Sequence, residues 1–268
     1  MENILDLSVI LPIKSAVSKD FDIYFERCIL SLQSQKVSFN DLIIVHTLEE
    51  QLVTKLNSFD FGELNVVMVP FEGEPNYQSQ INHGVKNTTS KWISLFEVDD
   101  EYANIWFSNV QKYIKFYPDV DTFLPIVVDV DEKGTFAGFT NEASFAANIA
   151  HEMGYLSNET LLNYQNFQTA GMVINREKFI EYGGFKPSIK LTFVYEMLLR
   201  MTHNSMRIMT IPKLGYKHTA LRDGSIFWNY KYGPDRLTEN EIKFWISSAK
   251  QEYFFNDDRN IKYKSEND

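Results

Sequence analysis

The sequence has very little cysteine, with Cys28 the single example among 268 residues. One cysteine excludes an intrachain disulfide framework and fits a reducing compartment. The sequence also lacks any apolar run near the roughly 20 residues that a membrane-spanning helix needs. The stretch from Met1 to Leu7 carries two acids and no base, which is unlike a secretory signal peptide. We therefore expect a soluble, cytoplasmic protein with no integral membrane segment.

Positive charge is scarce as well. The 26 lysines and arginines are outnumbered by 36 acids, so the formal net charge is -10. Proteins that bind the phosphate backbone of nucleic acid are usually basic. The acidic balance therefore disfavours nucleic acid as a general partner. Hydrophobic residues make up 44% of the chain, which is enough for a sizeable core. The length suits one large α/β domain, with or without a small appendage.

The first hundred residues alternate between two patterns. Short apolar runs are typical of buried parallel strands, and the segments between them show the spacing of amphipathic helices. This alternation predicts a mostly parallel sheet flanked by helices, with ligands at the carboxyl ends of the strands. Pro12, Ile13 and Lys14 follow the first strand, so we expect them to line a nucleotide pocket. The expected strands are 7–12, 42–45, 64–69 and 92–96, and the expected helices are 21–35, 49–59 and 78–87.

The second half is less regular. Residues 136–167 show no clear period, and no linker marks a domain boundary. We divide the chain into a main domain, 1–232, and a C-terminal helical extension, 233–268. The expected helices are 106–117, one capped by Asn175 and ended by Gly183-Gly184, 193–201, and one beginning at the Thr238–Glu241 capping box; the expected strands are 122–130, 172–174 and 206–211.

A cluster of acids follows the apolar run 92–96. Glu97, Asp99 and Asp100 fall within four positions. Carboxylates packed together in a low dielectric repel one another, unless a cation sits between them. Mg²⁺ and Mn²⁺ prefer oxygen ligands and share their shells with phosphates, and such an ion stabilises a departing diphosphate. The alternative, a solvated acidic turn, stays open on this pattern alone.

Several motifs occur together in a characteristic order. They are the first strand with Pro12, the helix ending Ser31-Leu32-Gln33-Ser34-Gln35, Asn82-His83-Gly84, the acids at 97–100, Tyr117-Pro118-Asp119 with Asp131-Glu132-Lys133-Gly134, Gly171–Phe179, and Gly183-Gly184-Phe185. In order and spacing, this set resembles the family 2 glycosyltransferases of GT-A fold, over about residues 7 to 225.

The resemblance implies an inverting glycosyltransferase that moves a sugar from a nucleotide-diphosphate donor to an acceptor hydroxyl. It implies Mn²⁺ or Mg²⁺ as cofactor, a UDP-sugar as the favoured donor, and a saccharide or lipid-linked saccharide as acceptor, with a modified DNA base least favoured. Glu97 and Val98 fall where the family contacts the donor, and Asp99 where it binds the metal. Glu97 replaces the usual aspartate. His46 and Thr47 replace the acids that help to read the base, so the base stays open.

The resemblance also implies a general base near the start of the helix 193–201. The family's usual Glu-Asp pair is absent there, and Glu196 is the available carboxylate. We expect Glu196 to be the base. The alternative is that Glu196 pairs with Arg200 at i+4.

The remaining expectations concern the donor and the acceptor. His218 is expected near the metal or diphosphate, Lys217 and Arg222 to neutralise the diphosphate, and Asn82 to anchor the donor; a structural role is the alternative for His218 and Asn82. Gly171 lets substrates approach the backbone. Candidate aromatic residues for stacking on an acceptor sugar are Phe139, Phe145, Tyr155, Tyr164, Trp228 and Tyr230.

Two other functions remain open. A nucleotidyltransferase can share this fold, but it usually has a glycine-rich, arginine-containing loop after the first strand, where this chain has Lys14-Ser15-Ala16-Val17-Ser18. A catalytically inactive protein that binds sugar nucleotides or assists assembly is the second alternative, because several expected acids are replaced.

Overall fold

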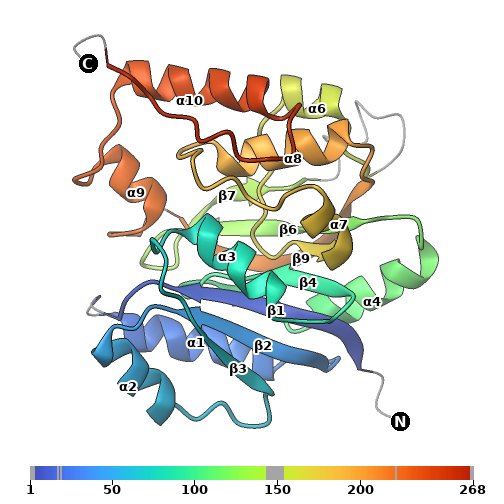
Figure 1. Cartoon of the computed structure of the whole chain (residues 1–268). Helices are drawn as coiled ribbons and strands as arrows, with labels where there is room; N and C mark the ends of the chain where they lie inside the picture. The colour runs from blue at the N-terminus through green and yellow to red at the C-terminus, as the bar shows by residue number, and fades with distance from the viewer. Residues whose placement is uncertain (1–3, 17, 19, 143–153, 221, 266–268) are drawn as a thin grey trace.

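The structure, a computed structural model, describes residues 4–16, 18, 20–142, 154–220 and 222–265. Within these residues a nine-stranded sheet forms the centre of the molecule (Figure 1), in the order β3-β2-β1-β4-β8-β6-β9-β5, with β7 paired to β6. The strands are β1 Leu5–Ile13, β2 Phe39–His46, β3 Val66–Pro70, β4 Trp92–Leu95, β5 Glu101–Tyr102, β6 Thr122–Val130, β7 Phe136–Thr140, β8 Val173–Asn175 and β9 Ile208–Thr219.

Helices cover both faces of this sheet. One core contains the apolar sides of α1, α2 and α4, and the other contains those of α3, α7, α8 and α10. Strand β1 serves both, because Val9 belongs to the first core and Ile10 to the second. The helices are α1 Phe21–Gln33, α2 Glu50–Ser58, α3 Tyr77–Lys86, α4 Trp106–Phe116, α6 Asn158–Asn163, α7 Arg176–Glu181, α8 Phe193–His203, α9 Ile226–Lys231 and α10 Glu239–Glu252.

The sheet is parallel on one side and mixed on the other. Strands β3, β2, β1 and β4 run parallel. Strand β8 is antiparallel to both β4 and β6, and β6 is parallel to β9. The carboxyl ends of β1 and β4 therefore meet at one edge, where the polar segments after Ile13 and Leu95 come together. This arrangement confirms the expected α/β class with a central sheet between helices.

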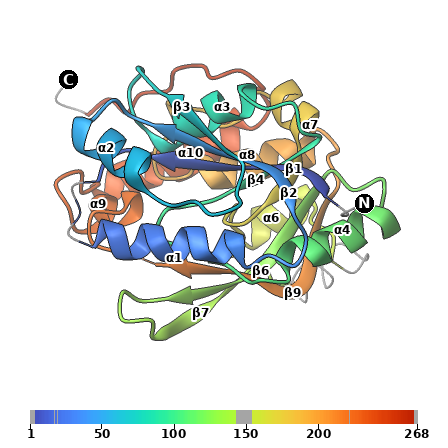
Figure 2. The ribbon, with the colours of Figure 1, turned by 90° about the horizontal axis from the view of Figure 1, so that it is seen from below.

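Each strand and helix that the sequence predicts is present, and all of them except β9 lie within a few residues of the expected bounds. The sequence did not predict β5, β7, α6 or α9, and the predicted strand 206–211 covers less than half of β9. The hairpin of β6 and β7 extends away from the body of the molecule (Figure 2), and most β7 side chains are exposed or half-exposed. The capping box of α10 is confirmed, since the Thr238 and Glu241 side chains each bond to the other's backbone.

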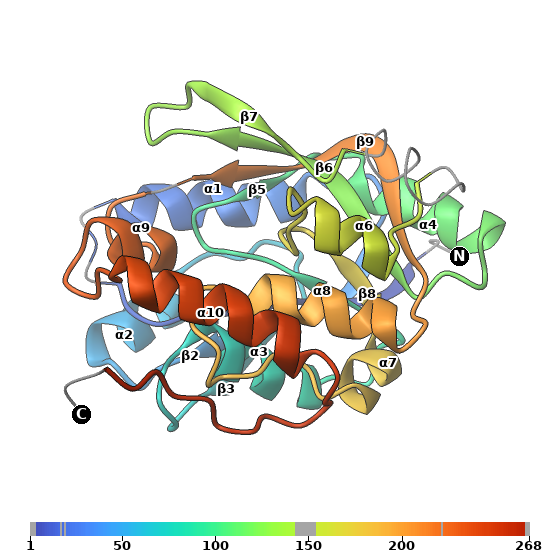
Figure 3. The same ribbon diagram turned by 90° about the horizontal axis from the view of Figure 1, so that it is seen from above.

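The C-terminal segment lies against the α8 side of the sheet. Helix α10 lies beside α8, and the tail after it doubles back toward the start of α10 (Figures 1 and 3). Trp245 of α10 belongs to the same core as Ile10 and Leu95. The boundary between 1–232 and 233–268 stays a prediction. No helix within the described residues is long and apolar enough to cross a membrane.

Candidate active site

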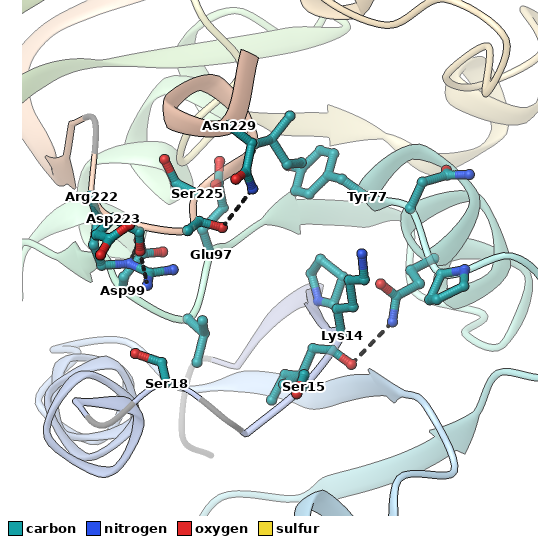
Figure 4. Close-up of a pocket in the computed structure, with 18 of the residues that line it drawn as sticks. Lys14, Ser15, Ser18, Tyr77, Glu97, Asp99, Arg222, Asp223, Ser225 and Asn229 are labelled. Carbon is teal, nitrogen blue, oxygen red and sulfur yellow. Dashed lines mark hydrogen bonds and ion pairs between the residues drawn. The ribbon is translucent and has the colours of Figure 1, made fainter. Parts of the chain in front are cut away.

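A cleft of about 1010 Å³ lies at the carboxyl ends of β1 and β4. Its walls come from the loop after β1, the start of α3, the acidic loop after β4, and α9 with the segment before it (Figure 4). In the close-up, Glu97 and Asn229 lie on the opposite side of the cleft from Ser15 and Ser18. The predicted site residues that line the cleft are Pro12, Ile13, Lys14, Glu97, Val98, Asp99 and Arg222.

The three acids after β4 do not share one environment. Glu97 and Asp99 line the cleft, whereas Asp100 is fully buried. The Asp100 carboxylate accepts a hydrogen bond from the Thr219 backbone N–H at 2.8 Å and lies 3.1 Å from Nδ1 of His218. Asp100 therefore fixes the acidic loop to the end of β9. The expectation that all three acids gather around one cation stays a prediction, and the structure places only Glu97 and Asp99 of the three in the cleft lining, with Asp100 bonded to β9.

Arg222 pairs with Asp99 in the lining of the cleft, where Figure 4 shows the two side by side. Its Nε lies 2.5 Å from Oδ2 of Asp99, and its guanidinium stands 5.4 Å from the centre of the Tyr24 ring. The segment around it is held as well, because the Asp223 N–H donates to Glu132 at 2.6 Å. A planar guanidinium held in this way presents donors that suit phosphate oxygens. Arg222 is thus placed to contact an anion beside Asp99.

The cleft acids are strongly perturbed. Burial, together with the neighbouring Asp100 carboxylate, raises the pKa of Glu97 to about 8, although His218 opposes the shift. Burial and Asp100 also raise the pKa of Asp99, which Arg222 pulls downward. Burial is the largest cause of both shifts, because it penalises the charged form, and the neighbouring acids add to it. A cation bound here would favour the charged form of both carboxyl groups.

His218 contacts the Asp100 carboxylate and does not face the cleft. It is not among the described residues that line the cavity. Burial lowers the pKa of His218, but the Asp100 carboxylate and its hydrogen bond, with Glu97 and Asp129, raise it to about 10. Its Nδ1 faces the Asp100 carboxylate, so in this arrangement His218 is the partner of Asp100, which was the structural alternative. The expected role of His218 as a metal ligand stays a prediction.

The residues fit a divalent cation that a substrate helps to hold. Among the described residues, no three His, Cys, Asp or Glu side chains converge to form a closed metal site. Mg²⁺ is commonly held by one or two carboxylates plus substrate phosphates. Glu97 and Asp99 supply such carboxylates at the cleft wall, with Arg222 competing for Asp99. The donor set therefore suits an ion shared with a diphosphate rather than one held by protein alone.

Glu196 lies in the interior and not in the cleft. Its side chain is fully buried, and Oε1 lies 3.0 Å from Nζ of Lys186 and 2.8 Å from Nε of Arg200. Arg200 in turn donates to the carbonyl oxygen of Gly184 at 2.6 Å. The pairing with Arg200, the alternative to the catalytic role, is thus present. A general base must reach the acceptor hydroxyl, and Glu196 is not among the described residues that line the cleft.

The start of α8 explains why no base is found there. Phe193 occupies the first helical position and is buried. Its ring centre lies 5.8 Å from that of Tyr77, which lines the cleft, and 5.6 Å from that of Phe185. Apolar packing therefore fills the place where the family's Glu-Asp pair was expected.

Three other expected donor contacts are also absent from the described cleft lining. Asn82 is bonded to Phe185 twice, accepting from its N–H at 2.9 Å and donating to its carbonyl at 2.7 Å. Lys217 lies 2.5 Å from Glu101. Gly171 has φ +68°, and a Cβ there would lie 2.5 Å from the Tyr216 ring. Each of these residues supports the framework around the cleft.

The cleft also contains residues that the sequence reading missed. Tyr77 and Gln80 come from α3, Lys190 from the loop before α8, and Ser225 and Asn229 from α9. One local signal was available, because Asn76 caps α3 by accepting from the Ser79 N–H at 2.8 Å. That cap begins the helix at the cleft edge. Helix α9 has a similar cap, because Ser225 accepts from the Trp228 N–H at 3.3 Å, but none of its residues is buried, so its sequence shows no apolar face.

Of the aromatic residues expected to stack on an acceptor, Tyr230 lines the cleft. Phe139 lies on the extended hairpin against Phe136, and Trp228 lies against Tyr232. The ring of Tyr155 faces Arg207, and that of Tyr164 faces Phe167. Phe145 lies outside the described residues.

Comparison with solved structures shows the same fold. A crystal structure of S. aureus TarS 1-349 in complex with UDP matches with TM-score 0.60 and 16% identity, covering 80% of this chain and 60% of that one. The same TarS segment in complex with UDP-GlcNAc matches with TM-score 0.59 and 15% identity, covering 83% and 60%. A further TarS 1-349 structure matches with TM-score 0.60 and 14% identity, covering 90% and 78%. This chain therefore spans less than two thirds of the TarS chains solved with UDP and UDP-GlcNAc.

Comparison with curated proteins found no match. The model of the family described as "Glycosyl transferase family 2" matches residues 8–183. This range runs from β1 through the acidic loop to the glycines after α7, and so includes most of the motifs on which the resemblance depends. The chain belongs to glycosyl transferase family 2.

Proposed function

We propose that this protein transfers a sugar from a UDP-sugar to a hydroxyl of a saccharide or lipid-linked saccharide acceptor. The observation that carries the proposal is the cleft at the ends of β1 and β4, where Lys14, Asp99 and Arg222 lie around one space. Its position is where α/β sheets bind nucleotides. The fold shared with TarS, which was solved with UDP and with UDP-GlcNAc, supports UDP as the nucleotide.

Assistance by Mn²⁺ or Mg²⁺ is part of the proposal. Among the described residues that line the cleft, seven are acids and three are lysines or arginines. A diphosphate entering such a cleft meets net repulsion, which a divalent cation between carboxylates and phosphates relieves. When bound, the cation stabilises the charge of the departing UDP. Arg222 would orient the diphosphate and Lys14 would lie at the nucleotide end.

Inversion requires a carboxylate that removes the proton of the acceptor hydroxyl. With Glu196 enclosed by Lys186 and Arg200, we propose that the base comes from the cleft acids. Those that remain besides Glu97 and Asp99 are Asp20, Glu74, Glu132, Asp223 and Asp235. Asparagine or glutamine at the true base should abolish transfer while UDP binding survives, and NMR of the product would show whether the anomeric configuration inverts.

Calorimetric titration with UDP-GlcNAc and UDP-glucose, with and without Mn²⁺, tests the donor and the metal together. Wild type should bind a UDP-sugar more tightly with Mn²⁺, and Asp99→Asn should lose that dependence. Asp119→Asn is the matched control, because Asp119 is 53% exposed and pairs with Arg207 on the surface. If wild type binds no UDP-sugar, or if Asp99→Asn responds to Mn²⁺ as wild type does, the proposal fails.

One observation favours a second candidate, a sugar-nucleotide-binding protein without transfer activity. Phe193 and Val194 begin α8 where a base was expected, and Glu196 is engaged in the interior. Such a protein would bind the donor yet neither hydrolyse nor transfer its sugar, and assays of UDP release decide between the two. Placement in the cytoplasm, expected from the single cysteine, stays a prediction.

A further inference from the structure

A second groove, which we call the tail groove, opens beside the cleft. Its volume is about 710 Å³, and its walls come from the first half of α10 and from the tail that doubles back along it (Figure 3). Lys190 lines both the tail groove and the cleft. The two spaces therefore adjoin at one side chain. The residues that line the tail groove include Lys190, Glu241, Trp245, Ile261, Lys262 and Tyr263.

The groove is held in shape by contacts of the tail. Asp258 accepts from the Ser188 N–H at 3.0 Å, and the Ile261 N–H donates to Oγ of Ser188 at 3.1 Å. Arg259 pairs with Glu252 at 2.7 Å. These bonds tie the tail to the loop before α8 and to the end of α10. A binding surface formed in advance loses little conformational entropy when a ligand arrives.

Trp245, one of the residues that line the groove, carries an unpartnered hydrogen-bond donor. The side chain of Trp245 is 2% exposed, and its indole N–H is buried without a partner among the described residues. Its backbone is already engaged, since Thr192 donates to the Trp245 carbonyl at 2.7 Å. A buried donor left without an acceptor costs free energy. Because the N–H is closed to solvent here, an acceptor atom from a ligand in the groove would satisfy it after a local shift of the atoms that cover it.

The chemistry of the other walls suits a hydroxyl-rich ligand with apolar faces. Tyr263 is half-buried against Phe244, with ring centres 5.3 Å apart, and Ile261 lies nearby on the tail. Lys190 and Lys262 add exposed donors. The groove's acid, Glu241, is engaged, because its carboxylate accepts from the Thr238 N–H and hydroxyl at 2.8 Å each. Sugars offer oxygen acceptors and apolar ring faces, which match a donor-rich, partly aromatic wall.

We propose that the tail groove binds a glycan chain, namely the part of the acceptor remote from the hydroxyl that reacts. The proposal rests on the proposed function, and it names the acceptor as an oligosaccharide rather than a single sugar. Because Lys190 lines both spaces, one glycan chain can lie in the tail groove while its end enters the cleft. The large net negative charge disfavours nucleic acid as the occupant.

The test uses the full chain and a glycan array that runs from monosaccharides to long oligosaccharides. Wild type should bind one or more long oligosaccharides and not their monosaccharide units. Trp245→Phe keeps a buried ring and removes the N–H, so it should weaken that binding by roughly tenfold. Tyr263→Ala, at the partly exposed rim, should weaken it also. Phe116→Ala is the control, because Phe116 is a 77% exposed aromatic residue on α4, outside the groove.

Melting curves check that each variant folds, and calorimetry with UDP on the same samples reports on the cleft separately. Loss of glycan binding with UDP binding retained supports the tail groove. Failure of UDP to bind wild type contradicts the proposed function, even where glycan binding is seen. Wild type that binds no long oligosaccharide, or folded Trp245→Phe and Tyr263→Ala variants that bind as wild type does, overturn the tail groove.

Discussion

Replacement of Glu196 by glutamine decides whether this carboxylate is structural or catalytic. Glu196 is fully buried, and its two cationic partners, Lys186 and Arg200, are each 1% exposed. Removing one partner of a buried ion pair typically costs about 3 to 5 kcal/mol, because it leaves an uncompensated charge in the interior. Two cations share this one carboxylate, so its removal should cost at least the lower end of that range.

The effect should be visible in equilibrium unfolding. Urea titration followed by circular dichroism should show a loss of about 3 to 5 kcal/mol in the free energy of unfolding. At about 2 to 4 °C per kcal/mol, the melting temperature should fall by roughly 6 to 20 °C. Glu181→Gln is the matched control. Glu181 is 55% exposed and pairs with Lys178, so its loss should cost less than about 1 kcal/mol.

A second substitution tests whether the unpaired cations cause the loss of stability. Lys186→Met in the Glu196→Gln background removes one of the two stranded cations, and it should restore part of the lost stability. A Glu196→Gln protein that unfolds at the same urea concentration as wild type, yet no longer transfers sugar, would refute the structural interpretation. That result would return Glu196 to the role of general base.

Three further variants follow from particular contacts. Gly84→Ala should destabilise the protein by about 1 to 3 kcal/mol in urea unfolding, because its Cβ would lie 2.6 Å from Ile10; Gly138→Ala, where a Cβ meets nothing within 4 Å, should change little. Arg222→Lys should weaken UDP binding by roughly tenfold in calorimetry, since lysine cannot reproduce the guanidinium geometry; unchanged affinity would exclude Arg222 from the diphosphate site. Thr238→Ala should cost about 1 kcal/mol in thermal unfolding through loss of the α10 cap, and an unchanged melting temperature would contradict that role.

The first half of the fold could be predicted because its patterns are local. In β1, residues pack against helices on both faces, so most of the strand is apolar and only Asp6 and Ser8 interrupt the pattern. Helix α3 packs closely on the sheet at Gly84, because the absence of a Cβ there leaves room for Ile10 and Val45. The helix ends were also readable, since caps such as Asn175 act within three residues.

The elements that were missed lack such local signals. Strand β7 is largely exposed, so no buried face appears in its sequence. The strand β9 extends past Pro212 and Gly215, two residues that usually interrupt strands. Its pairing with β6 shifts register near Pro125, which absorbs the irregularity. Pairing with β6 makes both segments β-structure; β7 follows β6 directly in a hairpin, whereas β9 lies far from β6 in the sequence.

The candidate site, too, could be predicted only in part. The sequence places acids after β4, but it does not say which of them faces the cleft. Asp99 and Asp100 are adjacent, and their different roles come from Arg222, Thr219 and His218, which lie about 120 residues further along the chain.

The role of Glu196 also could not be predicted from its own helix. Its i+4 partner, Arg200, was visible in the sequence, whereas Lys186, the second cation, lies on a different element. A carboxylate with one exposed partner on its own helix remains available to a substrate, but one enclosed by cations from two elements does not. Whether an acid is catalytic, metal-binding or structural is therefore set by its distant neighbours. For this reason the motif order identifies the family more securely than it assigns the base.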